Sequence, residues 1–282
     1  MRGPSNGQER GSALDKALAV LEAITAQSQP IGLPDLSARL KLPRQTVHRV
    51  LTHLEKLGLV VRDPSRDRFS VGPRLSTLAL NALRTHNQSA PIHAILQQLV
   101  DEIEETCNVG VLDGLQFVYL ERIECQWPLR VHLQAGSRVP AHCTSGGKVM
   151  LAHLDEAVRA RLLRNVTLKP CTKYTITRTE ELEAELAEVR RRGYAVNNQE
   201  FMIGIIGVAV PIADCQGRVL AALAVHGPSP RLDLDRAIGF VPRLKEASAI
   251  MADAWTSGPE VADTPTSSRA SSARTAPARV GD

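Results

Sequence analysis

The chain has 282 residues, of which 43% are hydrophobic, so it can bury sizeable cores and favours two domains over one small module. The net charge is only +4, but residues 1–89 hold 13 Lys and Arg against 7 Asp and Glu. Basic charge concentrated in one part of a chain is the footprint expected of contact with phosphates. The five widely spaced cysteines form no CxxC pair, which argues against a disulfide framework or a zinc ribbon.

Nothing in the amino-acid sequence indicates a targeting or membrane-spanning segment. Residues 1–12 are polar and lack the apolar core of a signal peptide. The longest largely apolar run, residues 201–213, is too short to span a bilayer and is interrupted by Gly204, Gly207 and Pro211. We therefore expect a soluble cytoplasmic protein with no membrane partner.

The N-terminal region reads as a disordered tail over residues 1–11 followed by two helices. Ser12 can cap the first helix, and Pro30 ends the segment that carries it. Pro34 and Asp35 suit the first turn of the second helix. The first helix is predicted from one apolar stripe at helical spacing, formed by Leu14, Leu18, Leu21 and Ile24.

A third helix runs from Pro43, which opens it, to Gly58, which suits the position just after a helix end. Its apolar stripe consists of Val47, Val50, Leu51, Leu54 and Leu57. On the remaining surface Glu55 is the only acid. Arg can read guanine and Gln adenine in a major groove, so this face is predicted to bind DNA. The candidate DNA-binding residues of this helix are Arg44, Gln45, Thr46, His48, Arg49 and His53.

A basic hairpin follows the third helix. Val60 and Val61 precede the turn at residues 63–68, and Phe69 and Val71 follow it. Arg66 and Arg68 at its tip are candidates for phosphate or minor-groove contact, the alternative being a merely solvated hairpin tip. Helix, turn, helix and hairpin together predict a winged helix-turn-helix over residues 12–73.

The second half changes pattern after a connecting helix at residues 73–86, and the linker between the two domains is predicted at residues 74–89. Strands mixed with helices and joined by short turns indicate an α+β domain with an antiparallel sheet over residues 90–256. The Ser-, Pro- and Ala-rich residues 257–282 are predicted to be disordered. The expected strands are 108–114, 115–123, 128–136, 204–213 and 218–227, and the expected helices are 92–103, 147–153, 155–163, 179–192 and 233–255.

The segment from Cys143 to Lys148 carries the most suggestive chemistry of this domain. A glycine pair that enters a helix exposes backbone N–H groups at the positive end of the helix dipole, which favours a carboxylate ligand. Val149 stands where a phosphate-binding P-loop needs Ser or Thr. Ser145 and Lys148 match S-x-x-K of serine hydrolases, but the SDN and KTG partners do not occur. The alternative is a glycine pair that only packs the helix against the sheet.

A metal site could be assembled from His132, His142 and Cys143, but their spacing matches no local ligand pattern. We expect no metal and no cofactor. Glu200 is expected to support a neighbouring loop by hydrogen bonding.

Five segments carry a resemblance to a known family. They are LKLPRQTVHRVLTHLEKLGLVVRD (40–63), FSVGPRL (69–75), GSRVPAHCTSGGKVMLA (136–152), RRRGYAVNNQE (190–200) and GVAVPIADCQGRVLAALAVHGP (207–228). On these segments the chain resembles, from about Ser12 to Trp255, the IclR family of bacterial transcription regulators. The resemblance implies an N-terminal winged helix, a linker helix and a GAF/profilin-like C-terminal domain that binds a small effector, commonly a metabolite carboxylate. It also implies homodimers, which often pair into tetramers on double-stranded operator DNA.

The same resemblance carries effector contacts onto Ser145, Gly146, Asn197 and Gly207. Two of them depart from the family pattern, since Gly207 stands where cysteine is common and Asn197 where an acid is frequent. Gly207 should enlarge the pocket, and Asn197 removes a charge. Leu129 and Val131 would form apolar pocket wall, or simply belong to a core strand.

Three functions are compatible with these observations. The first is a ligand-responsive transcription regulator, which would not be an enzyme and would have no catalytic residues. The second is an acyl-transfer hydrolase that uses Ser145 and Lys148. The third is a constitutive DNA-binding protein whose second domain only oligomerises.

Overall fold

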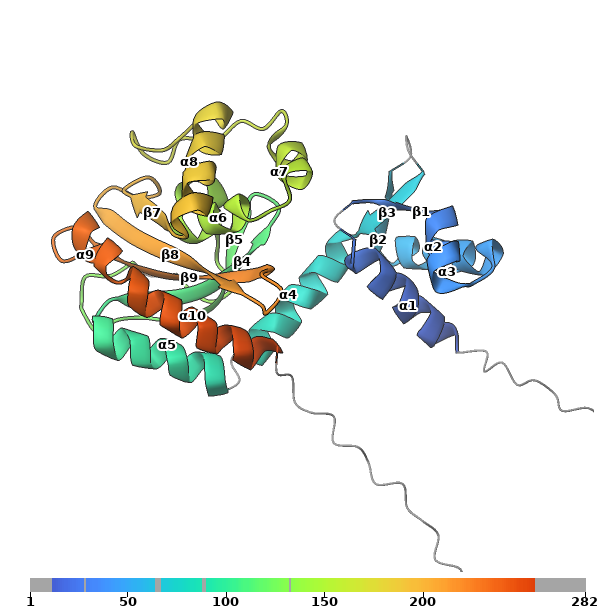
Figure 1. Cartoon of the computed structure of the whole chain (residues 1–282), viewed down its shortest axis with the longest axis horizontal. Coiled ribbons are helices and arrows are strands. Elements are labelled where there is room, and N and C mark those ends of the chain that lie inside the picture. Colours follow the sequence, from blue (N-terminus) through green and yellow to red (C-terminus); the bar gives the residue numbers. More distant parts are fainter. Residues whose placement is uncertain (1–11, 28, 64–66, 88–89, 132, 257–282) are drawn as a thin grey trace, which may run out of the picture.

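The N-terminal part of the molecule is a winged helix-turn-helix, as predicted (Figure 1). In this computed structural model the described residues are 12–27, 29–63, 67–87, 90–131 and 133–256. Three helices pack beside a small antiparallel sheet with the strand order β1-β3-β2. The elements are α1 (Ala13–Thr25), β1 (Ile31–Gly32), α2 (Leu33–Leu40), α3 (Arg44–Lys56), β2 (Val60–Asp63) and β3 (Arg68–Val71).

Local sequence signals account for the ends of these helices. Ser12 caps α1 through a capping box, in which its hydroxyl accepts from the Asp15 N–H and the Asp15 carboxylate accepts from the Ser12 N–H. Pro43 is the N-cap of α3. Gly58 follows the end of α3 with φ +70°, a conformation that favours glycine. The predicted start of α1 and both ends of α3 are therefore confirmed, whereas α1 ends at Thr25, before the predicted stop at Pro30.

One stripe residue of α3 is wrongly placed by periodicity. Val47, Leu51 and Leu54 are buried in the core of this part, and Val50 is half-buried. Leu57 is 37% exposed, because the last turn of α3 runs past this core to the bend at Gly58.

Helix α4 (Pro73–Asn87) leads from the winged helix to the second part, as Figure 1 shows. That part is built on a six-stranded antiparallel sheet with the order β6-β5-β4-β9-β8-β7. Its strands are β4 (Thr106–Asp113), β5 (Gln116–Ile123), β6 (Arg138–Pro140), β7 (Ala195–Asn198), β8 (Ile205–Ala213) and β9 (Val219–Pro228). Its helical segments are α5 (Ala90–Ile103), η1 (Ala141–Cys143), α6 (Ser145–Ala152), α7 (Glu156–Leu163), α8 (Thr179–Arg192), α9 (Leu234–Gly239) and α10 (Val241–Thr256).

The two faces of this sheet carry different side chains. Alternation along β8 and β9 places Val208, Val210 and Leu223 in the core beneath α5 and α10. The residues between them, including Ala209 and Ala224, face α6 and α8 in a second core. Small side chains on that face allow α6 to approach the sheet. The predicted α+β fold with an antiparallel sheet is confirmed.

Some predicted elements are wrong. Residues 128–136 contain no strand among their described positions; β5 is instead paired by β6 at Arg138–Pro140. In this segment the Val131 carbonyl accepts from the buried guanidinium of Arg122. The predicted helix 233–255 is two helices broken at Phe240, next to Pro242, which disfavours a continuous helix. Strands β1, β6 and β7, of two to four residues, are too short for periodicity to predict.

Within the described part of the chain, no helix combines the length and the apolar character needed to cross a bilayer.

Candidate nucleic-acid interface and ligand pocket

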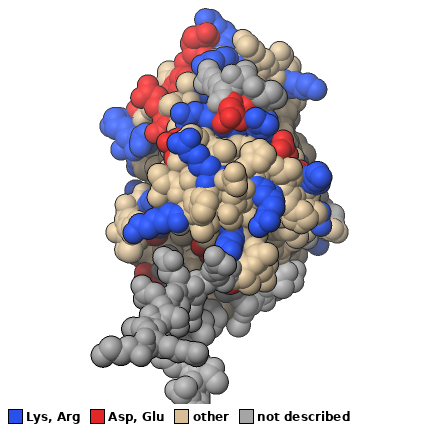
Figure 2. All heavy atoms as spheres, turned by 90° about the vertical axis from the view of Figure 1, so that its right-hand side faces the viewer, with Lys and Arg blue, Asp and Glu red and all other residues tan. Residues whose placement is uncertain are grey.

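The first site is the outer face of α3. Arg44, Gln45, His48, Arg49 and His53 are exposed there, and Thr46 is half-buried. Figure 2, which faces this end of the molecule, shows Lys and Arg side chains spread over the surface, whereas Asp and Glu gather mainly towards its upper edge. The exposed basic residues that α2, α3 and their connection contribute are Arg39, Lys41, Arg44, Arg49 and Lys56.

Arg44 and Arg49 have no folding role that their contacts reveal. Neither side chain forms a hydrogen bond or an ion pair with another described residue. Arg44 is moreover the first residue of α3, whose first turn holds no acid. A cation at the positive end of a helix dipole is unfavourable by about 0.3–1 kcal/mol. Its placement there favours a role in binding an external anion.

The wing arginines differ from those of α3. Arg68 donates to the Pro30 carbonyl over 2.9 Å and so ties β3 to the end of the α1–β1 connection. Arg62 pairs with Asp67 and lies 5.9 Å from the Phe69 ring centroid. Arg66, the other predicted wing contact, lies outside the described residues.

The second site is a pocket on the α6 face of the large sheet. Of the predicted effector contacts, Val131, Ser145, Gly146 and Asn197 line it. Leu129 does not line it, since its side chain is 65% exposed and only its carbonyl is engaged, by Arg231. The loop after β7 contributes further lining residues, Phe201 and Met202.

Gly207 lies behind the pocket, paired with His226 across β8 and β9. A Cβ at position 207 would lie 3.0 Å from the His226 Cβ and 3.5 Å from the Ser145 Oγ. The absence of a side chain at position 207 therefore makes room partly for His226, which itself lines the pocket, so it does not simply enlarge the pocket.

The glycine pair of the Cys143–Lys148 segment is required by packing. A Cβ on Gly146 would come within 2.5 Å of the Phe117 ring, and one on Gly147 within 2.4 Å of the Ala141 backbone. Both glycines thus let the start of α6 approach β5 and η1. Packing alone therefore explains why both residues are glycine. The same close approach brings the N-terminus of α6 to the pocket.

The first turn of α6 has no side-chain cap. Its N-cap residue, Thr144, instead donates its hydroxyl to the Pro140 carbonyl over 3.0 Å. The first backbone N–H groups of a helix lack partners within the helix. Ser145 and Gly146 therefore bring backbone donors, together with the Ser145 hydroxyl, to the pocket lining.

A buried polar chain forms the opposite wall. The Arg122 guanidinium lies 3.0 Å from Nε2 of His226, and Nδ1 of His226 lies 3.2 Å from the Asn108 amide. Arginine only donates, so Nε2 must accept. Burial, with Arg122 nearby, lowers the pKa of His226 to about 3, so the ring is neutral and its proton sits on Nδ1.

This proton position orients Asn108. A protonated Nδ1 needs an acceptor, and the two ends of an amide are nearly identical in shape, so the network assigns the Asn108 oxygen to His226. In the structure Nδ2 of Asn108 faces His226, and Oδ1 at the other end of the buried amide has no hydrogen-bond partner among the described residues. The assignment therefore turns the amide by 180°, which lets Oδ1 accept from His226 and places the NH2 group, a donor, at the unpartnered end on a residue that lines the pocket.

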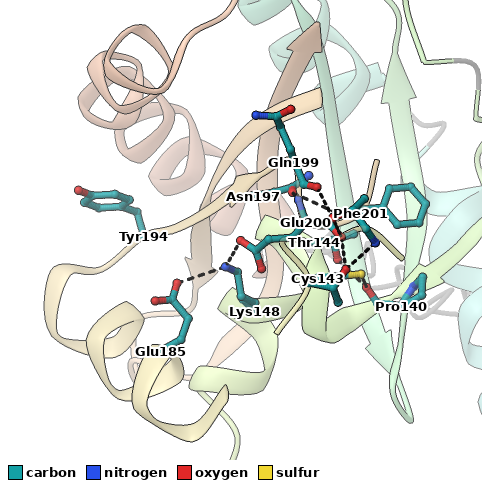
Figure 3. Close-up of polar contacts among 12 residues, drawn as sticks. Pro140, Cys143, Thr144, Lys148, Glu185, Tyr194, Asn197, Gln199, Glu200 and Phe201 are labelled. Carbon is teal, nitrogen blue, oxygen red and sulfur yellow. Dashed lines mark hydrogen bonds and ion pairs between the residues drawn. The ribbon is translucent and has the colours of Figure 1, made fainter. Parts of the chain in front are cut away.

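Asn197 shapes the loop that follows β7. Its Oδ1 accepts from the backbone N–H groups of Glu200, over 2.9 Å, and Phe201, over 3.4 Å (Figure 3). A carboxylate oxygen could do the same, so the departure from the family's acid preserves the loop. Compared with an acid at this place, Asn197 puts a donor where the second carboxylate oxygen would be and removes a negative charge from the lining.

Beside this loop lies a buried ionic cluster. Lys148 Nζ is 2.7 Å from Glu200 Oε1 and 3.2 Å from Glu185 Oε1, as Figure 3 shows. Burial raises the pKa of Glu200, and the Lys148 ammonium opposes that rise only in part. An ammonium held by two carboxylates is not placed to act as a base toward Ser145. Glu200 supports the loop as expected, through both its side chain and its backbone.

The metal alternative gains no support from the positions that are described. The ring of His142 bonds to the Lys169 carbonyl, and the Cys143 thiol lies near Cys171. His132 lies outside the described residues.

Asn108, Tyr119 and His226 line the pocket but were not predicted from the sequence. The available signal was a lone polar residue at an inward position of an apolar strand, as in CNVGV and AVHG. Such a residue must find a buried partner, and here Asn108 and His226 find each other over a separation of 118 residues.

Comparison with known proteins identifies both halves. Residues 13–64 match the IclR helix-turn-helix domain, and residues 80–252 match the bacterial transcriptional regulator IclR C-terminal domain. The chain is 46% identical over 237 residues to the "Probable transcriptional regulator SauR" of Cupriavidus necator H16, covering 84% of this chain and 94% of that protein.

Solved structures show the same arrangement. The crystal structure of the Thermotoga maritima IclR matches with a TM-score of 0.57 and 28% identity, over 86% of this chain and 97% of that one. An IclR homolog from Microbacterium hydrocarbonoxydans, solved in complex with 4-hydroxybenzoate, matches with a TM-score of 0.55 and 26% identity, over 88% and 100%. The two matching domain models are those of a transcription regulator family and not of an enzyme family. The chain therefore belongs to the IclR family of bacterial transcription regulators.

Proposed function

We propose that the pocket binds a small metabolite carboxylate and that this binding changes the affinity of α3 for operator DNA. The observation that carries the proposal is the donor character of the pocket. The α6 N-terminus and Ser145 lie on one side, the Asn108 NH2 group lies on the other in the orientation assigned from the His226 network, and Asn197 contributes no negative charge. Such a lining favours a ligand with acceptor oxygens.

Two further observations support a carboxylate with an apolar body. Phe117, Tyr119 and Phe201 provide apolar lining beside the donors. The homolog from M. hydrocarbonoxydans was solved with 4-hydroxybenzoate, which has a carboxylate on an aromatic ring.

On the DNA side, Arg44, Gln45, Thr46, His48, Arg49 and His53 are proposed to enter the major groove, with Arg66 and Arg68 contacting the backbone or minor groove. Residues 12–73 would form the DNA-binding unit, 74–89 the linker, and 90–256 the effector-binding and oligomerisation unit. A cytoplasmic dimer, or a tetramer of two dimers, would place paired winged helices on a two-fold-related operator.

Effector control requires that the ligand interact differently with two states of the protein. The test is a gel shift of the full chain on DNA upstream of its own gene, at about 150 mM salt, with random DNA as control. Sequence-specific binding that one carboxylate from a metabolite panel weakens or strengthens supports the proposal. Equal binding to both DNAs contradicts it. Specific binding that no ligand alters, together with no thermal shift by any ligand, would leave a constitutive DNA-binding protein.

A matched pair of variants locates the ligand. Asn108→Asp replaces the amide donor with an acceptor, which carries a negative charge when ionised. The carboxylate concentration needed for a half-maximal response should therefore rise at least about tenfold. Gln216→Glu, in the exposed turn after β8, adds the same charge away from the pocket and should respond like the wild type. An unchanged response in Asn108→Asp would remove the donor argument.

A further inference from the structure

Two cysteine thiols outside the DNA-binding face lie within reach of each other. Sγ of Cys143 is 3.8 Å from Sγ of Cys171, although the residues are 28 positions apart. A disulfide holds its sulfurs about 2 Å apart, so closing this pair requires a shift of about 2 Å. Cys143 lies in η1, directly before Thr144, and Cys171 lies in the segment between α7 and α8.

Hydrogen bonds on both sides hold the two sulfurs near each other. The Lys169 carbonyl bonds to the His142 ring over 3.1 Å. The Thr172 hydroxyl donates to the Gln199 carbonyl over 2.7 Å, and the Thr175 hydroxyl to the Glu200 carbonyl over 2.6 Å. The Cys171 segment is thereby fixed against both η1 and the loop after β7.

The two thiols differ in access. Cys171 is exposed and open to a dissolved oxidant, whereas Cys143 has no exposed surface. Burial raises the pKa of the Cys143 thiol, with Cys171 as the next cause, so this thiol stays protonated. One accessible sulfur beside one shielded sulfur is the arrangement in which a first oxidation is followed by an internal reaction.

We propose that Cys143 and Cys171 are a redox-active pair, which hydrogen peroxide converts to an intrachain disulfide. The Cys171 thiolate attacks the peroxide; the O–O bond breaks, a sulfenic acid forms, and the released hydroxide takes a proton to become water. The Cys143 thiol then attacks that sulfur; the S–S bond forms, the S–O bond breaks, and the Cys143 proton leaves with the hydroxyl as water. Two electrons pass to the peroxide, and a dithiol reductant reverses the change.

The position of the pair gives the bond a consequence. Cys143 is followed by Thr144, Ser145 and Gly146, all of which line the pocket. The disulfide would tie the start of α6 to the segment that also holds the Glu200 loop. Insofar as it alters effector binding, the inference rests on the proposed function; the formation of the bond does not.

The other cysteines supply controls. Cys107 and Cys125 are buried, so neither presents a thiol to solvent. Cys215 is exposed in the turn after β8, and no described hydrogen bond joins it to another sulfur. Cys215→Ser therefore matches Cys171→Ser, since both remove one exposed thiol.

The test treats the reduced full chain with a small excess of hydrogen peroxide and follows its mass. The wild type and Cys215→Ser should lose about 2 Da and yield tryptic peptides 139–148 and 165–173 joined by a reducible bond. Cys171→Ser should yield no such link. The midpoint of thermal unfolding should rise on oxidation in the first two proteins and return with reductant.

Oxidation of Cys171 to a sulfinic acid without the link would overturn the proposal, as would a link that involves Cys215 or a second chain. Because this readout needs neither DNA nor effector, its result is independent of the gel shift. A disulfide that forms in a protein without specific DNA binding would refute the proposed function alone.

Discussion

The outer face of α3 and the pocket beside α6 use polar residues in opposite ways. On α3 the arginines are exposed and make no described contact within the protein, so they contribute little to its folding. Around the pocket the polar groups are buried, and each fixes another, as Lys148 fixes Glu200 and Arg122 fixes His226. Changes on α3 should thus alter binding without altering stability, whereas changes beside the pocket should alter both. Four variants test this contrast.

The largest effect is expected from Lys148→Met. It leaves the buried Glu200 carboxylate without its cation, which costs about 3–5 kcal/mol in comparable pairs. Urea unfolding of the second part measures this loss. The loss should grow as the pH rises, because at low pH the carboxyl can take up a proton.

The double variant Lys148→Met/Glu200→Gln is the control for that change. Removing the buried charge should restore most of the free energy of unfolding. A double variant as unstable as the single one would mean that packing, rather than charge, sets the role of Lys148.

Arg44→Ala should weaken specific DNA binding by about 1–3 kcal/mol if Arg44 reads a base. The thermal midpoint should stay unchanged or rise slightly, because a cation leaves the positive end of α3. A gel shift and a melting curve of the same preparation measure both. Arg190→Ala removes an exposed arginine from α8 and should affect neither. A lower thermal midpoint for Arg44→Ala would contradict the expectation that changes on α3 alter binding without lowering stability.

His226 should make the second part sensitive to acid. Its pKa is about 3 in the folded protein, below the ordinary 6.5, so its contribution to stability is present above pH 6.5 and is lost as the pH falls towards 3. The free energy of unfolding should drop by about 2 kcal/mol between about pH 7.5 and pH 5 from this residue alone.

His226→Gln lacks a titrating ring and should show a correspondingly smaller drop over the same pH range, although it is less stable at neutral pH. Equal drops in both proteins would show that His226 is not held neutral.

The smallest effect is expected from Ser12→Ala, which removes the side-chain cap of α1 and should cost about 1 kcal/mol. The loss should appear in unfolding of the winged helix and leave ligand-induced stabilisation of the second part unchanged. Coupled losses in both parts would show that the two do not unfold separately.

Sequence patterns predicted the long elements of both parts but not every residue of the pocket. Helical spacing and the signals at Ser12, Pro43 and Gly58 were sufficient for α1 and α3, because these depend on neighbours in the chain. Asn108 and His226 belong to a pocket wall only because β4 pairs with β9. Alternation predicted Leu129 and Val131 to lie in a strand, and it does not reveal that the Val131 carbonyl bonds to the Arg122 side chain.

The division of the large sheet into two unlike faces has a consequence for how such a regulator can change over time. Val208, Val210 and Leu223 hold the sheet to α5 and α10 without reaching the ligand. The alanines and polar residues of the other face can therefore be exchanged while that framework keeps its packing. A duplicated gene could drift toward a new effector through substitutions around His226 and Asn197, but each of them would also change the stability of the second part, so compensating substitutions should accompany such drift.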